Sequence, residues 1–240
     1  MIYINGDSHS AGAELVDGCC FAADDRRYIA WGSRAHPEAI PLTFGYKIAQ
    51  ALNQPFFMDA ESASSNDRIL RTTRQFVEQT QNKSKLFCVI GWTTWDREEW
   101  EYQDGHIQIT ASGIDSVPES MQGEYKECVI NQTREELRRK RKLWTKQIME
   151  FSQELVEQDI KHIFFHTYDY IDYLKKQGYQ TINDGEHFGI DAHTAWFKHL
   201  LPQAIEQFGV QNTLTNVEKR SIVNTVKEQF IRLREGNPEV

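Results

Sequence analysis

The stretch KLFCVIG, residues 85–91, is apolar throughout after its lysine, and this unbroken pattern decides the fold class. A strand with both faces buried has such a pattern, whereas a strand with one wet face alternates apolar and polar residues. Shorter runs of similar character lie at residues 1–4, 55–58 and 160–166. We therefore expect a parallel sheet that is covered by helices on both faces.

Amphipathic segments separate these apolar runs. Helical periodicity is present in residues 43–52 and 66–81 and again in residues 131–158. The last of these segments has a single apolar stripe, formed by Leu137, Trp144, Ile148, Phe151 and Leu155. A linking helix follows the fourth run, and a final core helix is expected to turn three side chains inward: Trp196, Leu200 and Ile205. Alternating strands and helices predict a three-layer α/β/α architecture.

Two regions fall outside this alternation. Residues 98–130 are polar and turn-rich, and they predict an insertion with a hairpin around HIQIT that overhangs a site. Near the other end, Thr215 and Glu218 form a capping box that predicts a helix within residues 209–240. We expect this extension to pack back on a domain of residues 1–208, with docking on a protein partner or a second copy as the alternative.

Composition limits the classes of partner. The 240 residues carry a formal charge of −8, which excludes a basic surface for nucleic acid or an anionic membrane. The basic run at residues 134–146 also contains glutamates and fits a solvated helix face. Neither the cysteines nor the histidines have metal-ligand spacing, so we expect no metal. Because no leader or membrane-spanning run is evident, the expected location is the cytoplasm.

Chemistry-bearing side chains occur in two short motifs. GDSHS, residues 6–10, follows the first strand directly, and DGEH, residues 184–187, precedes the final core helix. A serine nucleophile needs a histidine base that is itself oriented by a carboxylate, and the second motif contains both groups. Parallel strands present their carboxyl ends at one edge of a sheet, where ligands bind. The alternative is that Ser8 is only a helix N-cap in a turn.

These two motifs resemble the first and last sequence blocks of the SGNH (GDSL-type) hydrolases, a flavodoxin-like α/β family of esterases, lipases and acyl-processing enzymes. The resemblance spans roughly residues 1–208. It implies that Ser8 is the nucleophile, His187 the base and Asp184 the orienting acid, with no cofactor. The stretches SSNDRI and GWTTWDR also resemble divergent SGNH-like proteins of bacteriophages, for which a virion location is the alternative.

The resemblance also implies an oxyanion hole. Its donors are the backbone N–H of Ser8 and that of Ala63 or Ser64, where the family has glycine. Thr93 stands where the family has an asparagine, and its hydroxyl is a shorter donor. Asn66, in the preceding block, is a candidate substitute amide donor.

Three further residues follow or line the predicted site-side loops. Arg68 and Arg97 either bind an anionic substrate or pair with acidic side chains. Trp92 either walls an acyl or sugar pocket or belongs to the core. Together these features predict a serine hydrolase that cleaves a carboxylic ester, an acyl or acetyl group on a small molecule or glycan. The alternatives are acyl transfer and a non-catalytic SGNH-like binding module, for example in a phage particle.

Overall fold

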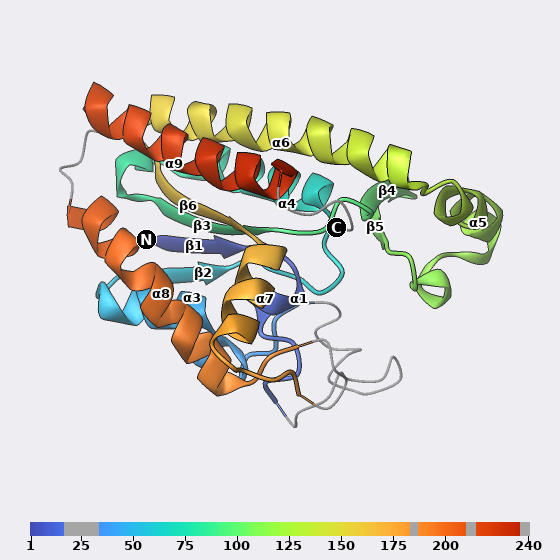
Figure 1. The fold of residues 1–240 in the computed structure, drawn as a ribbon, viewed down its shortest axis with the longest axis horizontal. Coiled ribbons are helices and arrows are strands. Elements are labelled where there is room, and N and C mark those ends of the chain that lie inside the picture. Colours follow the sequence, from blue (N-terminus) through green and yellow to red (C-terminus); the bar gives the residue numbers. More distant parts are fainter. Residues whose placement is uncertain (17–33, 183–186, 210–214, 236–240) are drawn as a thin grey trace.

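A computed structural model describes residues 1–16, 34–182, 187–209 and 215–235 of the chain. Its centre is a four-stranded parallel sheet with the strand order β2-β1-β3-β6 (Figure 1). The strands are β1 (Ile2–Asn5), β2 (Phe56–Met58), β3 (Phe87–Trp92) and β6 (Lys161–His166). The four apolar runs thus form the four predicted strands, and their pairing is parallel throughout, as expected.

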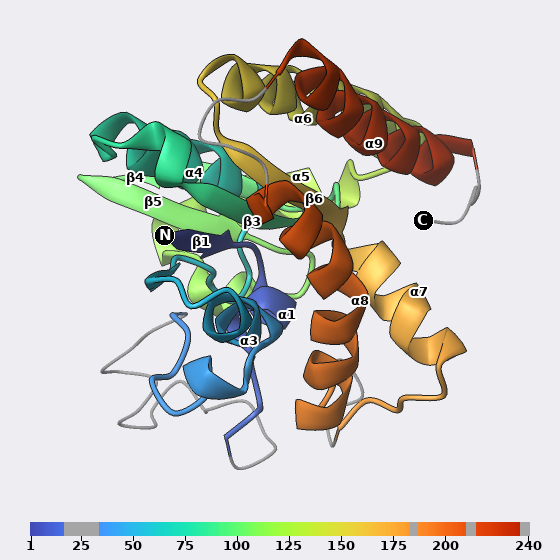
Figure 2. The same ribbon diagram turned by 90° about the vertical axis from the view of Figure 1, so that its left-hand side faces the viewer.

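Helices cover both faces of this sheet (Figures 1 and 2). One face packs against α4 (Asn66–Gln79), α6 (Arg134–Glu157) and α9 (Asn216–Glu235). The other face packs against α3 (Phe44–Ala51), α7 (Thr167–Lys176) and α8 (Ile190–Gly209). Short 3₁₀ turns lie at Ile40–Leu42, Lys83–Lys85, Ile114–Ser116 and Glu119–Met121.

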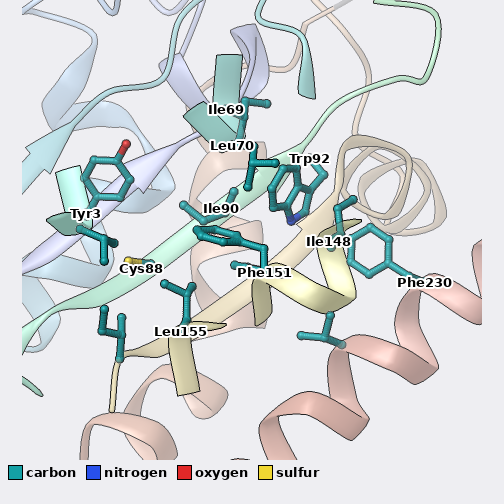
Figure 3. Close-up of a cluster of buried hydrophobic side chains, with 14 of the residues drawn as sticks. Tyr3, Ile69, Leu70, Cys88, Ile90, Trp92, Ile148, Phe151, Leu155 and Phe230 are labelled. Carbon is teal, nitrogen blue, oxygen red and sulfur yellow. The ribbon is translucent and has the colours of Figure 1, made fainter. Parts of the chain in front are cut away.

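Strand β3 contributes side chains to both apolar cores, which explains its unbroken apolar sequence. Cys88, Ile90 and Trp92 point to the face covered by α4, α6 and α9, as Figure 3 shows. Phe87 and Val89 point to the opposite face. All six residues of the strand are buried, so no position along it tolerates a solvated side chain.

The helical stripes are largely as predicted, with one error. On α6 the residues from Trp144 to Leu155 bury the expected face, while Leu137 is half-buried. On α8, Trp196 and Leu200 are buried, but Ile205 is 54% exposed and Ala204 takes its place. Ala204 lies four residues beyond Leu200 and shares its face, whereas Ile205 is rotated by a further 100° or so.

The insertion forms a separate apolar cluster at one end of the molecule (Figure 1). Its hairpin, predicted from HIQIT, consists of β4 (Glu98–Tyr102) and β5 (Gly105–Ile109). A helix, α5 (Gln122–Ile130), was not expected from the sequence. Only Tyr125 of α5 is fully buried, so α5 lacks the apolar periodicity by which a helix is recognised.

The C-terminal helix α9 lies along α6, and it packs back on the domain as expected (Figure 1). Its capping box is formed: Glu218 Oε2 accepts from the Thr215 N–H at 2.7 Å, and Thr215 Oγ1 accepts from the Glu218 N–H at 3.3 Å. Val226 and Phe230 enter the core beneath α6. Within the described part of the chain, every helix is too short or too polar to span a lipid bilayer.

Candidate active site

The turn after β1 is built for close packing against β3. Gly6 has φ 151°, and a Cβ there would lie 2.4 Å from Ser10 Oγ and 2.9 Å from the Gly91 carbonyl oxygen. Glycine is therefore required for the short helix α1 (Ser8–Ala11) to approach the sheet. Asp7 caps this helix through the hydrogen bond that its Oδ1 accepts from the His9 N–H at 3.1 Å.

Ser8, His187 and Glu14 form a continuous chain of contacts at the carboxyl edge of the sheet. The Ser8 Oγ lies 2.8 Å from His187 Nε2, and His187 Nδ1 lies 2.8 Å from Glu14 Oε1. All three residues are less than 8% exposed. An ionised carboxylate only accepts hydrogen bonds, so Nδ1 carries the imidazole proton and Nε2 accepts from the serine hydroxyl. This is the tautomer that a histidine base requires.

The structure thus brings two of the three expected catalytic residues together, Ser8 and His187. Asp184, expected as the acid, lies outside the described residues. Sequence reasoning missed Glu14, because one acidic residue in a turn has neither a periodic pattern nor a motif. One feature of the sequence could have indicated it: Glu14 lies only six residues after Ser8, so a turn between them can bring its carboxylate back to the site.

Asp7 joins the ends of three strands beneath Ser8. Its Oδ2 accepts hydrogen bonds from the Thr93 and Thr167 hydroxyls, each at 2.8 Å, and lies 3.8 Å from Arg97 Nη1. Burial by itself raises the pKa of Asp7, but His9, Arg97 and the two hydroxyls together hold it below its ordinary value. A buried carboxylate therefore fixes the loop after β3 to the turn that carries Ser8.

Thr93 and Asn66 are both occupied by contacts within the protein. The Thr93 hydroxyl donates to Asp7, and its backbone N–H donates to Asn66 Oδ1 at 2.9 Å. Asn66 Nδ2 donates in turn to the Thr93 carbonyl oxygen at 3.1 Å. These side chains lock two site-side loops together, and the Thr93 hydroxyl proton is directed at Asp7 rather than at the serine.

The loop after β2 also lies against the Ser8 turn, because the Glu61 N–H donates to the Gly6 carbonyl oxygen at 3.1 Å. Ala63 in this loop has a left-handed backbone with φ 64°. The Ser64 N–H donates to the Glu61 carbonyl oxygen at 3.3 Å. Among the described residues, by contrast, neither the Ser8 N–H nor the Ala63 N–H has a hydrogen-bond acceptor.

The three candidate substrate-binding residues occupy different surroundings. Arg68 is buried, and its Nη2 lies 2.7 Å from Glu61 Oε1, so it pairs with acidic side chains. Trp92 is fully buried in the core, edge-on to two phenylalanine rings. Arg97 is 21% exposed, with Nη1 3.4 Å from the Ser64 carbonyl oxygen as well as near Asp7. It is the one member of the set that reaches both solvent and the site.

Several other histidines are buried and neutral. Burial lowers the pKa of His162 to about 4 and the pKa values of His166 and His193 to about 3. His193 Nδ1 accepts a hydrogen bond from the Phe44 N–H at 3.4 Å and so has a structural role between α8 and α3. The His9 ring lies beside the His187 ring, with centroids 4.9 Å apart.

No three His, Cys, Asp or Glu side chains converge on a common point in the part of the chain that the structure describes. No family model matches the chain, and neither a curated protein nor a solved structure matches it.

Proposed function

We propose that this protein is a serine hydrolase of the SGNH type, which cleaves an acyl or acetyl ester on a small molecule or glycan. The observation that carries the proposal is the 2.8 Å contact between Ser8 Oγ and His187 Nε2, which joins residues 179 positions apart. A serine and a histidine with a purely structural role would need only the contact with each other. A nucleophilic serine also needs a carboxylate that orients the histidine base, and Glu14 is in that position.

The sheet order supports the same family. The order β2-β1-β3-β6 corresponds to the first four strands of the flavodoxin-like arrangement, with helices in a layer on each side. In such folds the ligand lies beyond the carboxyl ends of the strands, and Ser8, Ala63 and Thr93 all follow strand ends on that side.

In the proposed reaction, Ser8 Oγ attacks the ester carbonyl carbon while His187 Nε2 takes the hydroxyl proton. The tetrahedral intermediate collapses when His187 returns that proton to the leaving alkoxide oxygen, which breaks the C–O bond and leaves an acyl-serine. Water then attacks the acyl carbon while His187 takes one of its protons, and the C–Oγ bond breaks as His187 returns that proton to Ser8 Oγ, which releases the carboxylic acid. Each proton taken by the imidazole is given back, so the enzyme is regenerated.

Backbone donors support the negative charge in this scheme. The N–H groups of Ser8 and Ala63, which have no acceptor within the described part of the chain, are the proposed oxyanion donors. Arg97 is the residue proposed to contact an anionic group of the substrate. Since the Thr93 hydroxyl donates to Asp7, the family's third donor has no equivalent here. The loss of one such donor lowers the rate by about 10²-fold to 10³-fold. We accordingly propose a slow hydrolase.

A fluorophosphonate probe, which forms a covalent bond only with an activated serine, tests the proposal. We expect the wild type to be labelled, and Ser8→Ala and His187→Ala to lose the label. Ser10→Ala is the matched control, because Ser10 is buried two residues away and its hydroxyl has no partner among the described residues. An unlabelled wild type, or equal labelling of Ser8→Ala, contradicts the proposal.

The alternative is a non-catalytic module that binds a glycan or a protein partner, as in a phage particle. The diversion of Thr93 to Asp7 is the observation that favours it. It predicts no labelling of the wild type, so the same experiment separates the two functions.

A further inference from the structure

We infer that Asp7 and Thr167 are positioning residues for Ser8: a buried carboxylate, and a hydroxyl at the end of β6 that donates to it, hold the turn that presents the nucleophile. This inference deepens the proposed function and rests on it, because the orientation of Ser8 affects a rate only if Ser8 attacks a substrate. Neither residue is proposed to contact the substrate.

Helix α1, which begins at Ser8, is too short to hold its own orientation. It contains four residues, and a helix of this length has few internal hydrogen bonds to offset the entropy lost by its backbone. Contacts with Asp7 hold it instead. Asp7 Oδ1 accepts from the His9 N–H at 3.1 Å. The Asp7 carbonyl oxygen accepts from the N–H groups of Ser10 and Ala11 at 3.0 and 2.9 Å. A movement of Asp7 therefore moves Ser8.

The second carboxylate oxygen of Asp7 connects this helix to the ends of two other strands. The last residues that pair between β3 and β6 are Trp92 and His166. Thr93 and Thr167 are the next residues along the two strands, and both hydroxyls lie 2.8 Å from Asp7 Oδ2. The parallel register thus spaces the two donors so that one oxygen accepts from both. We call the carboxylate and these two hydroxyls the Asp7 clamp.

Charge fixes the direction of the hydrogen bonds in the Asp7 clamp. Asp7 is fully buried, and burial raises its pKa, but His9, Arg97 and the two threonine hydroxyls outweigh this effect and hold the pKa below its ordinary value. The carboxylate is therefore ionised at neutral pH and can only accept, so both hydroxyls donate to it. Hydrogen bonds to an ionised acceptor are shorter and stronger than neutral ones.

The Asp7 clamp determines where the serine lies relative to its base. Ser8 Oγ is 2.8 Å from His187 Nε2, and the two groups come from distant parts of the chain. The clamp fixes the serine side of this contact to the sheet, because Asp7 is hydrogen-bonded to the residues that follow β3 and β6. A displacement of about 1 Å at a reacting group lowers a rate by about 10²-fold. We therefore expect the loss of one hydroxyl to slow the chemical step and to leave substrate binding unchanged.

Thr167 gives the cleanest test, because Asp7 also caps α1 and Thr93 stands where the family has an oxyanion donor. Thr167→Val removes the hydroxyl and keeps the shape of the side chain, whereas Thr167→Ser keeps the hydroxyl. With 4-nitrophenyl acetate, we expect Thr167→Val to lower kcat by about 10-fold to 10²-fold with little change in KM, and Thr167→Ser to restore kcat. The rate constant for fluorophosphonate labelling, measured per folded molecule, should fall in parallel.

Thr73→Val is the matched control. Thr73 is also fully buried, and its hydroxyl donates to the Ile69 carbonyl oxygen at 2.6 Å and accepts from Asn5 Nδ2 at 2.9 Å. We expect this variant to be less stable but to keep the wild-type rate constants per folded molecule. A merely structural role for Thr167 predicts the same of Thr167→Val, and that result overturns the inference.

Two further outcomes are decisive. If Thr167→Ser is as slow as Thr167→Val, the hydroxyl is not the group that matters and the inference is overturned. If Thr167→Val does not fold, Thr167→Ala decides by the same criteria, because it also lacks the hydroxyl and places no methyl group against the carboxylate.

Amide NMR separates this inference from the proposed function. The chemical shift of the Ser8 N–H depends on the position of α1 and needs no substrate. We expect it to move in Thr167→Val and to return toward the wild-type value in Thr167→Ser. If it does so in a protein that neither reacts with the fluorophosphonate nor cleaves the ester, the proposed function fails and the Asp7 clamp stands. If the wild type reacts and Thr167→Val reacts equally fast, the proposed function stands and the inference fails.

Discussion

Ala63 holds a left-handed backbone conformation, with φ 64°, in the loop between β2 and α4. The family resemblance implies a glycine at this position or the next, and glycine adopts this conformation without a steric penalty. In this chain an alanine adopts the conformation that a glycine adopts more readily.

We predict that Ala63→Gly raises the free energy of unfolding by about 0.5–1 kcal/mol, because relief of strain exceeds the entropy lost with the side chain. Urea unfolding measures this change through its midpoint. Ala195→Gly, within helix α8, is the control and should lower stability by about 1 kcal/mol. A lower midpoint for Ala63→Gly would show that the left-handed turn is not under strain.

At the scale of elements, the Gln108 side chain connects the hairpin of the insertion to the residue that caps α4. Gln108 Oε1 accepts from the Ser65 N–H at 2.8 Å, and Gln108 Nε2 donates to Glu99 at 2.8 Å. Ser65 is fully buried and caps α4, since its Oγ accepts from the Arg68 N–H. The insertion therefore supports the loop that contains Ala63 and Ser64.

We predict that Gln108→Ala lowers the free energy of unfolding by about 1–3 kcal/mol, because it leaves the buried Ser65 N–H without an acceptor. It should also slow ester cleavage, since the loop that bears the Ala63 donor is less firmly held. Urea unfolding and kcat measure the two effects. Gln103→Ala, at the exposed turn of the same hairpin, should change neither. Equal behaviour of the two variants would show that the insertion is independent of the site.

Helix α9 is the other element whose contribution can be isolated. Phe230 is fully buried. It lies in the core with Trp144, Ile148 and Phe151 of α6. Phe230→Ala should lower the free energy of unfolding by about 3–5 kcal/mol, the effect of removing a buried aromatic ring. Denaturant unfolding checks this value. Val217→Ala, 76% exposed on the same helix, should have little effect, and a similar effect of both would mean that α9 is not part of the core.

At the scale of the whole molecule, buried histidines make stability depend on pH. Desolvation lowers the pKa of His162 to about 4 and those of His166 and His193 to about 3, against about 6.5 in the unfolded chain. Above pH 6.5 both states are neutral and stability is complete. Below it the unfolded chain binds protons that the fold excludes, so stability falls as pH decreases toward about 4.

We predict a loss that approaches about 1.4 kcal/mol per pH unit for each of these histidines. Asp67, whose pKa burial raises to about 6, binds a proton in the folded state and offsets part of the loss below pH 6. Urea unfolding at pH 7, 6 and 5 measures how the free energy of unfolding changes with pH. The variant His193→Gln should reduce this pH dependence by the contribution of one of the three histidines. A midpoint that is constant from pH 7 to 5 would contradict the prediction.

The sequence was sufficient for the sheet and for the pairing of motifs from opposite parts of the chain. Strands buried on both faces are continuous apolar runs, and parallel order brings their carboxyl ends together, so Ser8 and His187 were expected to meet. Helix α5 and the role of Glu14 were not expected, because both depend on tertiary contacts that leave no periodic pattern in the sequence. Helix α5 is held by Tyr125 in the apolar cluster of the insertion. Glu14 is recognised only by its contact with the His187 imidazole.

The separation of the base from the nucleophile has a consequence during protein synthesis. His187 follows Glu14 by 173 residues and Ser8 by 179 residues, although all three meet in the folded chain. A ribosome has therefore completed β1, β2, β3 and β6 before it adds the imidazole. A nascent chain that has not yet reached residue 187 therefore has Ser8 without its partner imidazole, and the contact between the two side chains can form only after that residue has been added.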